Sequence, residues 1–291
     1  MQIHQRVHSS INRNLIYYCI FALLLALYAP VVFHWYDGWL NKSISLEHEY
    51  FSHGVIGLPF AAYISWHKRK QWQKIKDSFN PLGGFLLAIG LVFYVTGVID
   101  FVNLSLPIVL ASLCLCIKGM RGLKLHFFPL LLVFFATPTS VPYLMTPSTL
   151  PLQKFIAVCA GFILMQLGMD VSVTGIHVAV DGRLVEVAPY CAGLKMLFTT
   201  LYVGAMLLYW TDNHRNRQKV SILLTSSVII SIVANILRNT VLAYFHGAGR
   251  DDLFYWLHDS WGGDLYSAIM LGIIVLLLNY LDRESADTSL T

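Results

Sequence analysis

Three residues in the C-terminal half of the chain have side chains that could together carry out covalent catalysis: Cys191, Arg238 and His258. A cysteine thiolate attacks carbonyl carbons, and an imidazole can take the thiol proton and later protonate a leaving amine. A guanidinium can stabilise the oxyanion of a tetrahedral intermediate. The set therefore predicts acyl transfer at a thiol, chemistry that needs neither a metal nor an organic cofactor.

Cys191 stands between a polar segment and an apolar run, shortly after Pro189. We expect a helix to begin at Cys191, where unpaired backbone N–H groups and the helix dipole favour a thiolate. The alternative is an interfacial thiol without chemistry. The other cysteines lie inside apolar runs, where a thiol behaves as a small hydrophobic group, and no pair has zinc-site context or an obvious disulfide partner: Cys19, Cys114, Cys116 and Cys159.

Arg238 lies near the predicted outer end of another apolar run. An arginine at membrane depth is costly, which makes it a candidate for function. The alternative is a side chain that extends to the interface as an anchor. Asn235 and Asn239 flank it in sequence and favour a polar site that faces the protein interior, so we expect both to support the site.

The base is predicted to be His258, which precedes the last apolar run, although a histidine among tryptophans is also common at a membrane interface. His246 is the main competitor, since it too is predicted to lie outside and close to Arg238. His53 is a third candidate, at a predicted helix start. Glu186 is a weaker supporting candidate in a predicted hairpin.

The composition indicates that membrane helices position these residues. Of 291 residues, 56% are hydrophobic and only 12% are charged, about half the charged share of soluble domains. The basic clusters are short and fit loops between spans, which argues against nucleic-acid binding. The first run lacks a small-residue cleavage site and is expected to be a retained span. The apolar runs are residues 14–33, 54–67, 82–99, 102–117, 125–137, 150–168, 191–210, 220–244 and 263–281.

Residues 170–189 have a different pattern, with β-branched residues interleaved with polar ones. Asp181-Gly182 separates two such runs, and Asp-Gly between β-branched runs is the strongest short signal for a hairpin. An open sheet edge cannot face lipid. We therefore predict a small β-hairpin outside the bilayer core, inserted in a single membrane domain that comprises residues 1–291.

The basic residues set the predicted orientation. They cluster in three loops, at residues 67–76, 118–124 and 214–219, which the excess of Lys and Arg on the inner side places in the cytoplasm. An even number of spans must separate these loops, so one of the nine runs cannot cross. Residues 150–168 have polar residues at their ends and are expected to lie in the interface or to re-enter the membrane.

These arguments predict an all-α integral membrane protein with about eight transmembrane helices, one interfacial or re-entrant helix and a small extracytoplasmic β-hairpin. The predicted topology puts Cys191, the end of the 220–244 helix and the polar loop at residues 246–261 on the outer side of the plasma (inner) membrane, in contact with lipid.

Five stretches of the sequence match the motifs of one known family: Tyr50-Phe51-Ser52-His53-Gly54 with Tyr63 and Trp66; Thr137-Pro138 through Leu152-Gln153 and Gly168 to Gly175; Glu186 to Leu194; Asn235 to Asn239; and His258 with Gly262. In these stretches, which span most of the chain, the sequence closely resembles the exosortase/archaeosortase family and is most similar to its cyanobacterial branch, the cyanoexosortases.

The resemblance implies a membrane thiol peptidase or transpeptidase. Exosortases are proposed to process exported proteins that carry a C-terminal sorting signal, which consists of a Pro-Glu-Pro-like motif, one transmembrane helix and a basic tail. The catalytic residues of the family correspond to Cys191, Arg238 and His258. Ala192 stands where many members have Ser, so no role is expected for that hydroxyl.

Three other functions are compatible with the membrane pattern. A transporter or channel would suit eight spans, but the sequence shows no inverted repeat and few charges within the central spans. A membrane acyltransferase could use the same thiol on a lipid or a small acyl donor. A non-catalytic scaffold would leave Cys191 without a role, so replacing Cys191 separates the enzymes from the scaffold and the transporter.

Overall fold

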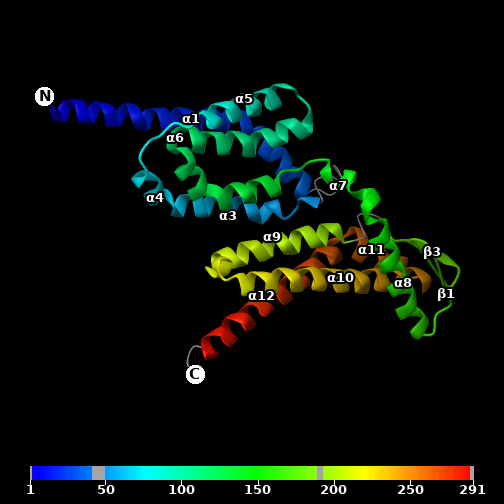
Figure 1. The fold of residues 1–291 in the computed structure, drawn as a ribbon. Coiled ribbons are helices and arrows are strands. Elements are labelled where there is room, and N and C mark those ends of the chain that lie inside the picture. Colours follow the sequence, from blue (N-terminus) through cyan, green and yellow to red (C-terminus); the bar gives the residue numbers. More distant parts are fainter. Residues whose placement is uncertain (1, 41–49, 189–192, 289–291) are drawn as a thin grey trace. The chain divides into compact units, whose positions relative to one another are not determined.

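The structure is a computed structural model that describes residues 2–40, 50–188 and 193–288. It divides into two compact units, Met1–Thr139 and Ser140–Thr291, and each is described by itself (Figure 1). The first unit contains helices α1 (Gln2–Leu40), α3 (Gly54–His67), α4 (Arg69–Lys74), α5 (Pro81–Val95) and α6 (Ile99–Ala136). The second contains helices α7 (Val141–Leu144), α8 (Leu150–Gln166), α9 (Leu194–Trp210), α10 (Arg217–Gly247), α11 (Asp251–Asp259) and α12 (Trp261–Thr288), the short 3-10 turns η1 (Thr146–Thr149) and η3 (Asn213–Arg215), and strands β1 (Val171–Thr174), β2 (His177–Val180) and β3 (Arg183–Glu186).

Helix α6 includes both runs that the sequence predicted as separate helices, residues 102–117 and 125–137. Gly119 interrupts it with φ 60° and ψ −154°, a conformation that favours glycine. A Cβ on Gly119 would also lie only 2.6 Å from the Oγ of Ser78, which lies beside the kink because Ser78 and Lys118 form a β-bridge. The predicted interruption is therefore confirmed, as a kink at one glycine rather than a loop.

Five of the described helices are long and apolar enough to cross a membrane: Tyr18–Leu40, Ile99–Ala136, Pro147–Gln166, Arg217–Gly247 and Trp261–Arg283. Two shorter apolar helices are Pro81–Val95 and Leu194–Trp210. A multi-pass membrane protein is thus confirmed, whereas the count of eight spans stays a prediction. Pro147–Gln166 is long and apolar enough to cross, and Gln153 near its start is buried at 2% exposure, so the interfacial or re-entrant position of residues 150–168 stays a prediction.

The β insert has three antiparallel strands in the order β1-β2-β3, so the expected two-stranded hairpin was incomplete. Asp181 and Gly182 do form the β2–β3 turn, both with positive φ, and Val180 pairs with Arg183 across it. The missed turn is at Gly175, whose φ of 65° lets Thr174 pair with His177. Its Gly-Ile sequence is a weaker hairpin signal than Asp-Gly because only its first residue favours positive φ.

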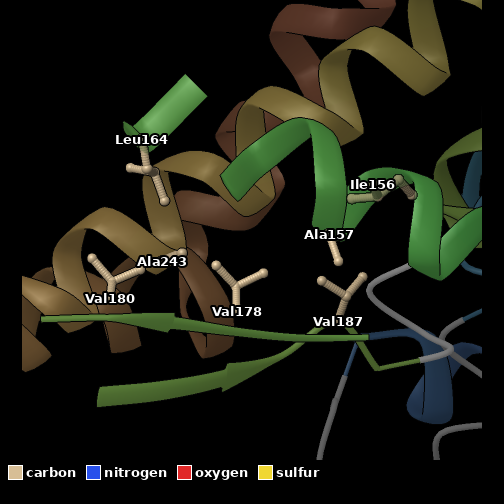
Figure 2. Close-up of a cluster of buried hydrophobic side chains, with 7 residues drawn as sticks. All are labelled: Ile156, Ala157, Leu164, Val178, Val180, Val187 and Ala243. Atoms are coloured by element: carbon tan, nitrogen blue, oxygen red, sulfur yellow. The ribbon is translucent and has the colours of Figure 1, made fainter. Parts of the chain in front are cut away.

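The sheet is fastened to the helices of the second unit by a core of seven buried side chains (Figure 2). Val178 and Val180 are two residues apart on β2 and therefore point to the same face of the sheet. They are 1% and 0% exposed. Figure 2 shows them facing α8 and Ala243 of α10. This core consists of Ile156, Ala157, Leu164, Val178, Val180, Val187 and Ala243.

A second core joins α9, α10 and α12 through Leu208, Leu223, Ile274 and Leu278. At the end of this bundle that carries η3, Lys219 of α10 forms an ion pair with Asp282 of α12 at 2.7 Å. The predicted polar loop at residues 246–261 is wrong in part, because residues 251–259 form α11. Asp251 and Asp252 in its first turn stabilise this helix through the helix dipole, a signal that the apolar pattern does not contain.

Candidate active site

One face of α10 is lined with buried polar side chains at intervals of four residues. Ser227, Ser231, Asn235 and Asn239 are all at most 5% exposed, and a spacing of four keeps them on one side of a helix. The Asn239 side chain donates to the Asn235 carbonyl over 2.9 Å. The expectation that Asn235 and Asn239 face the protein interior is therefore confirmed.

Arg238 lies between these asparagines and is half-buried. Its Nε is buried and has no hydrogen-bond partner among the described residues. Its Nη2 lies 3.9 Å from the position that a Cβ on Gly263, in the first turn of α12, would occupy. One turn before Arg238, the Tyr266 hydroxyl of α12 donates to the Ala234 carbonyl over 2.5 Å. Helix α12 therefore packs against one side of Arg238. The buried Nε–H group of Arg238 can still donate to an acceptor.

Cys191 lies outside the described residues, but both neighbouring segments are placed. On one side, the Val187 N–H donates to the Ile176 carbonyl over 2.9 Å, and the Val187 carbonyl accepts from the Gln153 side chain over 2.9 Å. On the other side, Gly193 has a φ of 86° and precedes α9, which begins at Leu194 and not at Cys191 as expected. A Cβ on Gly193 would lie 2.9 Å from the Asn235 side chain, so the backbone there contacts α10 directly.

His258 lies in the last turn of α11. Its ring stacks on Phe254, with centroids 5.3 Å apart and an interplanar angle of 8°. A Cβ on Gly263 would lie 4.0 Å from the His258 carbonyl oxygen and 3.9 Å from Arg238 Nη2. The His258 backbone and the Arg238 guanidinium therefore both lie close to Gly263. Gly262, the other glycine of the turn, would place a Cβ 2.7 Å from the Trp256 carbonyl. The two glycines therefore allow α11 and α12 to pack closely beside Arg238.

His246, the competing candidate, lies in the last turn of α10 in a different environment. Its Nδ1 lies 3.0 Å from a carboxylate oxygen of Asp251 in α11. Arg183 of β3 donates to the other oxygen of Asp251 over 2.9 Å and to the His246 carbonyl over 2.8 Å. The Arg183 hydrogen bond, with a smaller contribution from His246, holds the pKa of Asp251 below its usual value. The sequence does not single out Arg183 or Asp251, because only the sheet and the unpredicted α11 bring them together.

His53 belongs to the first unit. It immediately precedes α3 and is 5% exposed. Its Nε2 donates to the Phe135 carbonyl over 3.0 Å. Burial lowers the pKa of His53 to about 4, so the ring is neutral near pH 7. Gly54 is required beside it, because a Cβ there would lie 2.5 Å from the Trp39 ring.

Glu186 ends β3 and is the cross-strand neighbour of His177, with 3.9 Å between its carboxylate and His177 Nε2. Both side chains are about half exposed, so the pair contributes little to stability. Among the residues that the structure describes, no group of three or more His, Cys, Asp or Glu side chains could hold a metal ion.

Comparison with known proteins assigns the family. A family model described as Transmembrane exosortase (Exosortase_EpsH) matches residues 35–275, which include every candidate site residue. No curated protein and no solved structure matches the chain. The match covers most of the chain and agrees with the apolar helices of the structure. The chain therefore belongs to the transmembrane exosortase family.

Proposed function

We propose that this exosortase is a cysteine peptidase or transpeptidase that cleaves the C-terminal sorting signal of exported proteins on the outer face of the plasma membrane. In this proposal Cys191 is the nucleophile, His258 is the general base and acid, and Arg238 stabilises the oxyanion. The substrates carry a Pro-Glu-Pro-like motif, one transmembrane helix and a basic tail.

The observation that carries the proposal is the contact of Gly193 with Asn235, one turn before Arg238. Cys191 precedes Gly193 by two residues, and two peptide units span at most about 7–8 Å. Gly263 lies close to both the Arg238 guanidinium and the His258 backbone. Chain segments that carry the three proposed catalytic residues therefore meet along one stretch of α10.

The length of α10 supports the outer location. Arg217 begins the helix next to the basic segment with His214 and Arg215, which is cytoplasmic by the excess of positive residues on the inner side. Arg238 follows Arg217 by 21 residues, about 32 Å of helix. The hydrocarbon core of a bilayer is about 30 Å thick. Arg238 is therefore at the depth of the opposite interface.

The same helix favours His258 over His246 as the base. His246 follows Asn235 by 11 residues, about 16 Å along the helix axis, whereas Gly193 contacts Asn235 itself. A base must come within hydrogen-bond reach of the thiol, directly or through one water. His258 lies in the last turn of α11, and its carbonyl oxygen and Arg238 Nη2 lie 4.0 and 3.9 Å from the Cβ position of Gly263, so its backbone lies closer to the proposed nucleophile than that of His246.

The proposed reaction begins when His258 takes the thiol proton and the Cys191 thiolate attacks the scissile carbonyl carbon. Arg238 donates to the resulting oxyanion through N–H groups that need no reorganisation. As the C–N bond breaks, His258 returns the proton to the leaving amine. The thioester then passes the acyl group to water, which gives an acid, or to an acceptor amine, which gives an amide.

The location suits a substrate anchored by one helix. A peptide bond just outside such a helix lies at the outer interface, at the depth inferred for Arg238. The likeness to the cyanobacterial branch rests on the sequence motifs alone and stays a prediction. An acyltransferase would use the same thiol, and product analysis distinguishes the two activities.

A co-expression experiment tests the proposal. A tagged exported protein that ends in the sorting signal is produced with and without this chain. We expect a shortened, tag-bearing product only when the chain is present, with mass spectrometry placing the new C-terminus at the signal. Intact substrate, with the chain shown to be in the membrane, would overturn the proposal, and an acyl-modified but uncleaved product would favour the acyltransferase.

The contact between Gly193 and Asn235 gives a second expected result. Replacing Gly193 by Ala adds a methyl group 2.9 Å from Asn235 and strains a backbone with φ 86°. Gly168→Ala is a matched control, since its φ is 84° but no atom lies within 4 Å. We expect processing to fall about tenfold or more in Gly193→Ala, because small misplacements of a nucleophile are costly. Equal activity of the two variants would show that the contact does not matter.

A further inference from the structure

A group of three side chains joins the elements that lead to the proposed catalytic residues. Arg183 begins β3, which runs toward Cys191. His246 lies in the last turn of α10, which carries Arg238, and Asp251 begins α11, which carries His258. Arg183 bonds to both helices, through the His246 carbonyl and the Asp251 carboxylate, and His246 bonds to the same carboxylate. We call Arg183, His246 and Asp251 the clamp.

The sheet and α10 are also fixed to each other beside the clamp. A Cβ on Gly247, the last residue of α10, would collide with the side chain of Val180, and Val180 belongs to the buried core that contains Ala243 (Figure 2). Helix α10 and the sheet therefore form one packed block. Helix α11 meets that block through the clamp.

Helix α11 needs contacts with the rest of the fold to be stable. It has nine residues, and isolated helices of that length are marginal in water. Asp251, Phe254 and His258 are spaced three and four residues apart, which places them on one face. The His246 and Phe254 rings lie 5.3 Å apart, and Phe254 stacks on His258. A column of rings thus runs from the clamp to His258.

We propose that Asp251, Arg183 and His246 are positioning residues, which hold α11 so that His258 is presented to the thiol of Cys191. This inference rests on the proposed function. His258 follows Asp251 by seven residues, about 10 Å of helix, so a small rotation at the clamp displaces the imidazole. A shift of about 1 Å at a catalytic group can lower the rate about 100-fold.

The chain contains a matched control for Asp251. Asp252 is the next residue, also acidic and also in the first turn of α11, and it is exposed. Removing either carboxylate changes the helix dipole interaction to a similar extent. A difference between Asp251→Ala and Asp252→Ala therefore reports the bonds to Arg183 and His246.

The experiment measures processing of the sorting-signal substrate by the full-length chain in proteoliposomes. We expect Asp251→Ala to lower kcat about tenfold to 100-fold with little change in KM, since positioning acts on the chemical step. Asp252→Ala should stay close to the unmodified chain, and Asp251→Glu should recover part of the loss. Arg183→Lys, which keeps the charge but not the fork that reaches two acceptors, should give an intermediate kcat.

Two results would overturn the inference while the proposed function stands: equal kcat for the Asp251 and Asp252 variants, or a loss that appears only in KM. If Asp251→Ala does not fold, Asp251→Glu and Arg183→Lys decide, and unchanged kcat in both overturns the inference. Failure of the proposed function has a different signature, in which the unmodified chain processes no more substrate than Cys191→Ala does.

Discussion

Cys191→Ala is expected to abolish processing of the sorting signal, with a loss of about 10³-fold or more. Without the thiol no thioester can form, and the rest of a nucleophilic site retains only the weak catalysis due to binding and oxyanion stabilisation. The measurement is the rate at which the tagged substrate is shortened, for chains shown to be equally abundant in the membrane.

Cys159→Ala is the matched control for this experiment. Cys159 lies on α8 in the same unit and is a free, partly buried thiol, so its replacement by Ala tests whether the loss of any thiol has the same effect. We expect this variant to process substrate at nearly the unmodified rate. Full activity of Cys191→Ala would exclude Cys191 as the nucleophile.

Trapping the acyl-enzyme adds a test that does not depend on the rate. Hydroxylamine cleaves thioesters, so it should release substrate acyl groups from the unmodified chain as hydroxamates. No hydroxamate should appear with Cys191→Ala. Its release at the same level from both chains would place the acyl group on a different residue.

The helices were the most predictable part of this fold. Residues 54–67 were predicted from their apolar run alone and form α3 with the same bounds. Membrane helices can be predicted from apolar runs because lipid requires a long apolar segment whose backbone groups are all paired within the segment. The number of spans was less predictable, since α6 contains two apolar runs that are separated only by the kink at Gly119.

Short polar elements were predicted poorly. The sequence predicts a loop where α11 forms, because nine residues with two acidic groups, Asp251 and Asp252, lack an apolar run. The sheet was predicted from Asp181-Gly182, but the turn at Gly175 was missed. In these elements, contacts with the rest of the fold stabilise the structure, and local sequence preference is a weak guide.

The candidate site likewise contains residues that the sequence predicts and residues that it does not. Asn235 and Asn239 were expected to face inward, because two amides beside an arginine in an apolar run are costly in lipid, and both are buried. Arg183 gave no signal, since an arginine in a polar hairpin is ordinary. Its importance depends on Asp251 and His246, which lie more than 60 residues away in sequence.

Arg238→Ala is expected to lower kcat and kcat/KM about equally, by about 10²–10³-fold, the usual cost of losing an oxyanion donor. The half-buried guanidinium has a buried Nε without a partner among the described residues. This arrangement is expected of a donor whose acceptor is the oxyanion of the bound substrate. Arg238→Lys keeps the charge but loses the planar set of N–H groups, so we expect an intermediate loss.

The control for Arg238 is Arg217→Ala, which removes an exposed arginine at the other end of the same helix and should leave kcat close to that of the unmodified chain. The balance between the two kinetic constants decides the role of Arg238. If Arg238→Ala raises KM and leaves kcat unchanged, the guanidinium binds the ground state of the substrate, for instance a carboxylate of the sorting motif, and does not stabilise the oxyanion. If both constants are unchanged, Arg238 is an interfacial anchor, and the Asn235–Asn239 face of α10 must serve a purpose other than catalysis.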